Sequence, residues 1–78
     1  MANGDIKDTI VGLFRQKDSM KNIDLDENYF EKGVSSLTIV ELQIKVEEAL
    51  NLTIPTSQLM RLSTINGWVD AYTQKSEQ

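Results

Sequence analysis

The chain has 78 residues, of which 40% are hydrophobic and 6% aromatic, so it can form one small core and a multidomain enzyme is excluded. It contains no cysteine and no histidine, which excludes disulfides, thiolate zinc sites, cysteine nucleophiles and the commonest general base. Twelve acidic against eight basic residues give a net charge of −4, which disfavours nucleic acid and favours basic partner surfaces. We therefore expect a protein that is not an enzyme and has no catalytic residues.

The amino-terminal residues lack the basic stretch and apolar run of a secretory signal, and no segment approaches the length of a membrane span. The absence of cysteine is compatible with a reducing compartment. We expect a stand-alone, monomeric, cytoplasmic protein whose partners are neither membranes nor nucleic acids.

The first helix is predicted over residues 6–17, with Asp5 as its N-cap. Its apolar residues recur at helical spacing on one face, which comprises Ile6, Ile10, Leu13 and Phe14. Residues 18–35 show no such period, which predicts a long connection held on the core by Ile23, Leu25, Tyr29 and Phe30.

The longest helix is predicted over residues 36–50, which contain no glycine or proline, and Asn51 is its expected end. Thr56 is the expected cap of a short helix over residues 56–61. Ser63 or Thr64 caps a last helix, whose apolar face is formed by Ile65, Trp68, Val69 and Tyr72. The sequence shows no strand pattern, so we expect an all-α four-helix bundle that forms one domain over residues 1–78. The bundle should have a long first loop and a short third helix. The tail over residues 73–78 should fray and be flexible from about residue 74.

The helix predicted over 36–50 has two apolar faces. The broader one suits the core and comprises Ile39, Leu42, Val46, Ala49 and Leu50. The second comprises Leu37, Val40 and Ile44, with Glu41, Glu47 and Glu48 beside it. Either the helix is central and both faces are covered, or the second face is an exposed docking ridge whose acids orient basic partners.

The residues just before this helix combine a turn-permitting glycine, Gly33, with two hydroxyls. Ser35 is the expected N-cap, with its oxygen on the amide of Leu37 or Thr38. Ser36 would then project from the first turn, where the positive end of the helix dipole favours an attached phosphate.

The acidic segment 24–28 has the ligand spacing that opens a calcium loop. Tyr29, however, stands where the loop needs glycine, and Ser35 where it needs a bidentate glutamate. We expect no metal site.

Residues 29–42, with the sequence YFEKGVSSLTIVEL, resemble the attachment region of acyl and peptidyl carrier proteins. In that family an aromatic residue, a glycine and a hydrophobic residue lead into an Asp-Ser-Leu motif, whose serine begins the second of four helices and carries 4'-phosphopantetheine through a phosphodiester. Ser36 and Leu37 match the serine and leucine. The likeness covers nearly the whole chain and includes a Thr-Ile pair at the start of the fourth helix, here Thr64 and Ile65.

The resemblance implies a carrier that holds acyl or aminoacyl groups as thioesters on a 4'-phosphopantetheine arm derived from coenzyme A and attached to Ser36. It implies as partners a phosphopantetheinyl transferase, an acyl- or aminoacyl-loading enzyme, and ketosynthase, condensation or other processing enzymes. The residues that fall where carriers meet these enzymes are Leu37, Val40, Glu41, Ile44, Glu47 and Glu48.

Two positions depart from the family pattern: Ser35 replaces the aspartate before the modified serine, and Thr38 replaces an acid that often follows it. These departures favour a specialised carrier of polyketide or hybrid polyketide and nonribosomal peptide biosynthesis over a general carrier of fatty acid biosynthesis. The alternative is a helical protein-interaction adaptor, a degenerate carrier that docks through Leu37, Val40 and Ile44 while Ser36 stays unmodified.

Overall fold

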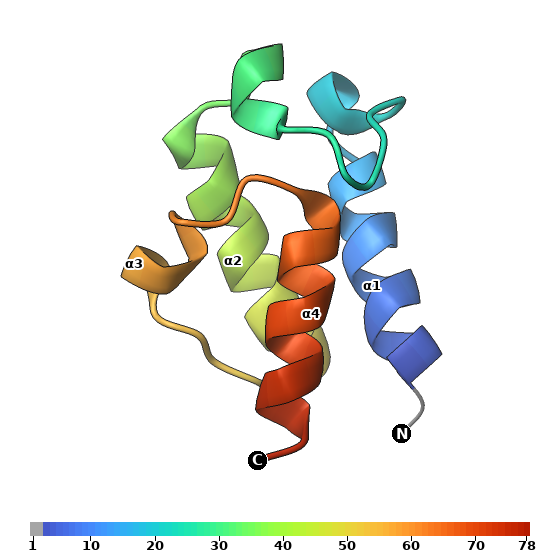
Figure 1. The fold of residues 1–78 in the computed structure, drawn as a ribbon, viewed down its shortest axis with the longest axis vertical. Coiled ribbons are helices and arrows are strands. Elements are labelled where there is room, and N and C mark those ends of the chain that lie inside the picture. The colour runs from blue at the N-terminus through green and yellow to red at the C-terminus, as the bar shows by residue number, and fades with distance from the viewer. Residues whose placement is uncertain (1–2) are drawn as a thin grey trace.

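The computed structural model describes residues 3–78 (Figure 1). In chain order its elements are α1 (Asn3–Arg15), the 3-10 turns η1 (Asp18–Met20) and η2 (Tyr29–Lys32), α2 (Ser36–Leu50), α3 (Thr56–Leu59) and α4 (Ile65–Ser76). The expected four-helix bundle is confirmed. Helix α1 packs against both α2 and α4, and the short α3 packs against α2 (Figure 1). The start of α1 and the end of α4 lie at one end of the bundle, and η1, η2 and the start of α2 lie at the other.

The bounds of α2 agree with the prediction because local signals mark both of its ends. Ser35 adopts extended backbone angles before the first turn, and Asn51 ends the helix in the left-handed conformation with φ of 56°. Asn tolerates that conformation better than most non-glycine residues. The start of α4 is also set locally, because the Thr64 hydroxyl accepts a hydrogen bond from the Gly67 amide at 2.9 Å.

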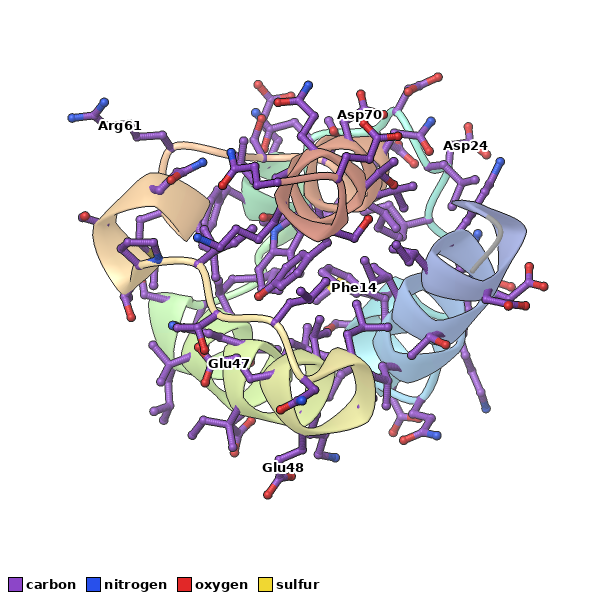
Figure 2. The ribbon with its side chains drawn as sticks, turned by 90° about the horizontal axis from the view of Figure 1, so that it is seen from below. Phe14, Asp24, Glu47, Glu48, Arg61 and Asp70 are labelled. Carbon is purple, nitrogen blue, oxygen red and sulfur yellow. The ribbon has the colours of Figure 1, made fainter. Side chains whose placement is uncertain are left out.

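The core lies between α1, α2 and α4 and includes side chains from the long connection. Phe14 lies in the centre of the bundle (Figure 2) and meets the Trp68 ring edge-on, with centroids 5.0 Å apart. From the connection, Ile23 and Tyr29 are buried as expected, as is Met20, which the sequence reading did not single out. The connection is thus part of the core, and it fixes the chain that leads into α2.

Four expectations about the helices are wrong. Asp5 is no cap, because α1 already begins at Asn3. Thr56 is no cap either, since Pro55 holds that position and the Thr56 hydroxyl instead donates to Gln43 Oε1 at 2.8 Å. The short helix α3 ends at Leu59 and α1 ends at Arg15, each two residues before its predicted end. Helix α4 extends to Ser76, and the fraying of the tail stays a prediction.

The core face of α2 also differs from the prediction at one residue. Ala49 is exposed, whereas Gln43 is buried together with Ile39, Leu42 and Val46. The buried arc is turned toward Gln43 because the segment that leads into α3 packs on that side of α2.

Among residues 3–78, none of the helices has the length and hydrophobicity needed to cross a membrane.

Candidate functional site

The turn before α2 determines how the chain enters the helix. Gly33 has a φ of 91°, a conformation that favours glycine, and its amide donates to the Phe30 carbonyl at 3.1 Å. Val34 is buried, and its amide donates to the Tyr29 carbonyl at 3.2 Å. The turn therefore seats one apolar side chain in the core and delivers the next two residues, Ser35 and Ser36, to the surface.

Ser35 is the N-cap of α2, as predicted. Its hydroxyl accepts a hydrogen bond from the Thr38 amide at 3.3 Å and lies 3.2 Å from the Thr38 hydroxyl. The two positions at which the family pattern carries acids are thus joined by their hydroxyls. The cap satisfies one of the free amides of the first turn without adding a negative charge.

Ser36 is the first residue of α2 and is exposed. Within the described residues 3–78 its hydroxyl makes no hydrogen bond, in contrast to that of Ser35. An exposed, unengaged hydroxyl at the positive end of a 15-residue helix suits a covalently attached phosphate, because the helix dipole and the nearby amides favour the negative charge. These residues fit a phosphodiester at Ser36.

The second apolar face of α2 is exposed. Leu37 is 71% and Ile44 53% exposed, and Val40 between them is half-buried. The interpretation of α2 as a helix covered on both faces is therefore wrong, and the interpretation as an exposed ridge is right. We call Leu37, Val40 and Ile44 the α2 ridge. That it binds partners stays a prediction.

The three acids beside the ridge have different surroundings. The Glu41 carboxylate accepts from Lys17 Nζ at 3.0 Å. Glu47 is half-buried and accepts a hydrogen bond from Gln43 Nε2 at 3.3 Å. Glu48 is exposed and points away from the bundle (Figure 2). Of the three acids, Glu48 is thus the one that is exposed and has no hydrogen-bond or ion-pair partner within residues 3–78.

Gln43 is a residue that the sequence reading missed. Its amide group donates to the Ile54 carbonyl at 3.3 Å and accepts from the Thr56 hydroxyl. These contacts join α2 to the segment that leads into α3. The sequence feature that could have indicated its burial is its position between Leu42 and Val46, which places a polar residue close to the apolar core face of the helix.

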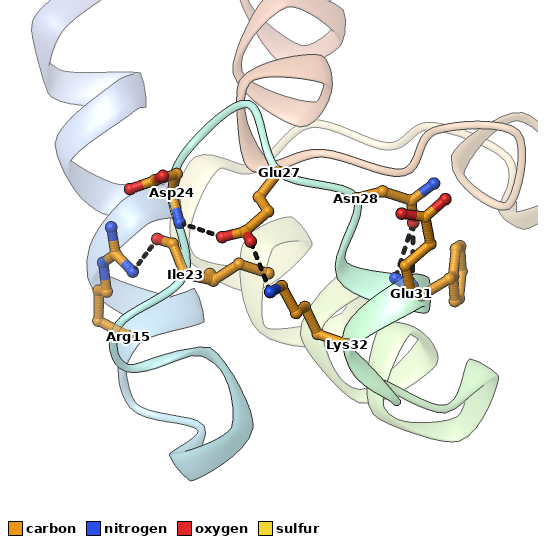
Figure 3. A network of polar contacts seen from close by, with 8 residues as sticks. Arg15, Ile23, Asp24, Glu27, Asn28, Glu31 and Lys32 are labelled. Carbon is orange, nitrogen blue, oxygen red and sulfur yellow. Dashed lines mark hydrogen bonds and ion pairs between the residues drawn. The ribbon is translucent and has the colours of Figure 1, made fainter.

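The long connection is held in shape by a polar network (Figure 3). The Glu27 carboxylate accepts from Lys32 Nζ at 2.8 Å and from the Asp24 amide at 3.0 Å, and these bonds lower the pKa of Glu27 and, through the same pair, raise the pKa of Lys32. Asn28 caps η2 by accepting from the Phe30 amide at 2.9 Å.

Two of the three carboxylates in the acidic segment 24–28, those of Asp26 and Glu27, thus serve structural contacts. Asp26 accepts from the Asn66 side chain at 2.7 Å, which joins the connection to α4. In the part of the chain that the structure describes, three or more acidic groups nowhere gather as a metal site needs.

Comparison with known proteins relates the chain to one protein family and to one curated protein. The family model described as "Phosphopantetheine attachment site" matches residues 6–72. A curated protein of Pseudomonas savastanoi pv. glycinea, named L-allo-isoleucine:holo-[CmaA peptidyl-carrier protein] ligase, is 35% identical over 52 residues, which are 67% of this chain and 9% of that protein. The chain therefore corresponds to a small part of this much longer relative. No solved structure matches the chain.

Proposed function

We propose that this chain, which belongs to the phosphopantetheine attachment family, carries acyl or aminoacyl groups and is itself modified at Ser36. The members of this family are non-catalytic tethering domains with a covalently bound 4'-phosphopantetheine. The bound group supplies the thiol that the polypeptide lacks. The chain itself supplies the attachment oxygen, the position of that oxygen on the bundle, and the surface that partner enzymes recognise.

The observation that carries the assignment to Ser36 is the difference between two adjacent hydroxyls. Ser35 Oγ is engaged with the Thr38 amide and hydroxyl, whereas Ser36 Oγ is exposed and unengaged within residues 3–78. Loss of the Ser35 hydrogen bonds would uncap α2, whereas modification of Ser36 breaks no contact within the described chain. Ser36 is therefore the residue that a transferase can modify at the lower structural cost.

The exposed α2 ridge supports a docking role next to the attachment residue. Leu37 directly follows Ser36, and Ile44 lies two helical turns further along the same face. An enzyme that contacts the ridge would have the start of α2 within its footprint. We propose that the phosphopantetheinyl transferase, the loading enzyme and later processing enzymes use this surface in turn.

The pathway that the sequence favours is polyketide or hybrid polyketide and nonribosomal peptide biosynthesis. The support is the neutral pair Ser35 and Thr38 at positions where general fatty acid carriers bear acids. The ligase relative, whose name refers to a peptidyl-carrier protein, is compatible with this proposal.

The test is the intact mass of the apo-protein after incubation with coenzyme A and a broad-specificity phosphopantetheinyl transferase. We expect one phosphopantetheinyl increment in the wild type and in Ser35→Ala, and none in Ser36→Ala. No increment in the folded wild type, beside a control carrier that is modified, would favour the adaptor that docks through the α2 ridge without modification.

A further inference from the structure

One charged residue outside the predicted site alters the electrostatics of the α2 ridge. Lys17, which follows α1, places its ammonium group 3.0 Å from the Glu41 carboxylate on α2. The Lys17 side chain is only 26% exposed, whereas that of Glu41 is 52% exposed. The lysine is therefore held against the bundle, while the acid it neutralises faces the surface beside Val40.

The ion pair between Lys17 and Glu41 contributes little to the stability of the fold. A partly exposed ion pair contributes about 0–1 kcal/mol to the free energy of unfolding. Its effect on surface charge is larger, because Glu41 stands immediately beside the ridge and lies within the first two turns after Ser36. The pair cancels the negative charge nearest to the attachment residue on α2.

The remaining charges of α2 leave one accessible acid. Lys45 is exposed, lies one turn after Glu41 and makes no ion pair within residues 3–78. Glu47 is half-buried and bonded to Gln43, so Glu48 alone is an exposed and unpaired acid among the described residues of α2. The half of α2 that contains Ser36, Leu37 and Val40 therefore has no uncompensated negative charge.

We propose that Lys17 is a specificity-determining residue, which neutralises Glu41 and thereby selects partner enzymes that meet the start of α2 through an apolar surface over enzymes that dock through a basic patch. The proposal rests on the carrier function proposed above and names the kind of partner it serves. A partner cation directed at Glu41 would have to displace Lys17, and the displaced ammonium would then repel the rest of the basic patch.

The test compares two phosphopantetheinyl transferases, one with a basic and one with a neutral docking surface, as probes of the apo-protein. The measured quantity is kcat/KM for loading, at low and at high salt. Removal of the lysine charge in Lys17→Gln should raise kcat/KM with the basic transferase by up to about five-fold at low salt, the equivalent of about 1 kcal/mol. The gain should vanish at high salt, and the neutral transferase should show no gain.

Two controls separate this effect from net charge. Lys7→Gln removes the same charge from an exposed position of α1, and it should leave kcat/KM unchanged with both enzymes. The double variant Lys17→Gln/Glu41→Gln should lose the gain, because no carboxylate remains to be uncovered. Circular dichroism of each variant establishes that the bundle is folded.

The outcomes distinguish this proposal from the one on which it rests. Equal gains for Lys17→Gln and Lys7→Gln, or no gain for either while the wild type is loaded, would overturn the role of Lys17 and leave the carrier function standing. A wild-type chain that neither transferase loads, beside an active control carrier, would overturn both.

Discussion

The indole Nε1 of Trp68 donates a hydrogen bond to the Tyr29 hydroxyl at 2.8 Å, and that hydroxyl in turn donates to the Leu62 carbonyl at 3.1 Å. Trp68 belongs to α4, whereas Tyr29 opens the turn that leads into α2. Both side chains are fully buried. The bond therefore ties the last helix to the segment that positions Ser36, and every polar atom of the two rings has a partner.

Tyr29→Phe should destabilise the protein, whereas Tyr72→Phe should not. Tyr29→Phe leaves the Trp68 N–H buried without an acceptor, at a cost of about 1–3 kcal/mol. The Tyr72 hydroxyl is buried and has no hydrogen-bond partner in the described chain, so its removal should be neutral or slightly stabilising. Urea unfolding of both variants measures the difference, and an equal loss of stability in the two would contradict this account.

Stability should fall as the pH rises above about 10, and Tyr72 should be one cause. Burial, and secondarily the charge of Glu47, raises the pKa of Tyr72 to about 12 in the folded chain, against about 10 in an unfolded one. Between these values the unfolded chain has lost the proton that the folded chain retains, so rising pH favours unfolding. Burial also raises the pKa of Tyr29, which adds to the same trend.

The comparison of the wild type with Tyr72→Phe isolates that contribution, because the two proteins differ only in the Tyr72 hydroxyl. Urea midpoints between pH 9 and 12 should fall less steeply in Tyr72→Phe. If the urea midpoints of the two proteins fell equally steeply with pH, Tyr72 would not be a cause of the loss of stability.

Ser35→Ala should lower stability by about 1 kcal/mol, the usual cost of losing an N-cap. Ser36→Ala should leave stability nearly unchanged, since the Ser36 hydroxyl makes no hydrogen bond within residues 3–78. Ser35→Asp retains a capping oxygen and adds a charge that the helix dipole favours, so it should restore or exceed wild-type stability. Thermal melts of the three variants test the assignment of cap and attachment residue, and a larger loss in Ser36→Ala than in Ser35→Ala would reverse it.

Gln43→Leu should loosen α3 from α2. The substitution leaves the Ile54 carbonyl and the Thr56 hydroxyl without their Gln43 partner, which we expect to cost about 1–3 kcal/mol. Amide hydrogen exchange should accelerate over residues 54–60 more than in α1, because the lost contacts are local to α3. Gln58→Leu, a change at an exposed position of α3, is the matched control and should alter neither quantity by much.

Leu37→Ala should separate docking from folding. Leu37 is 71% exposed, so its truncation should change the free energy of unfolding by no more than about 0.5 kcal/mol. If Leu37 contacts the transferase, kcat/KM for loading should fall at least about five-fold, the effect of losing about 1 kcal/mol of binding. Unchanged loading kinetics would remove Leu37 from the docking surface.

The local signals of the sequence determined where α2 begins and ends and how the chain enters it. Ser35 as cap, Asn51 as end and the uninterrupted run between them act within a few residues of each other, so the bounds of α2 could be predicted without knowledge of the fold. The motif at residues 29–42 likewise indicates the family from the sequence alone, because its residues are adjacent in the chain.

The tertiary structure decided which surfaces and charges remain available. Periodicity shows that α2 has two apolar faces, but only the placement of α1, α3 and α4 leaves Leu37 and Ile44 exposed and turns the buried arc toward Gln43. The ion pair of Lys17 with Glu41 joins residues 24 positions apart and follows from the way α1 packs on α2. Such contacts depend on distances between helices, which no local pattern of residues encodes.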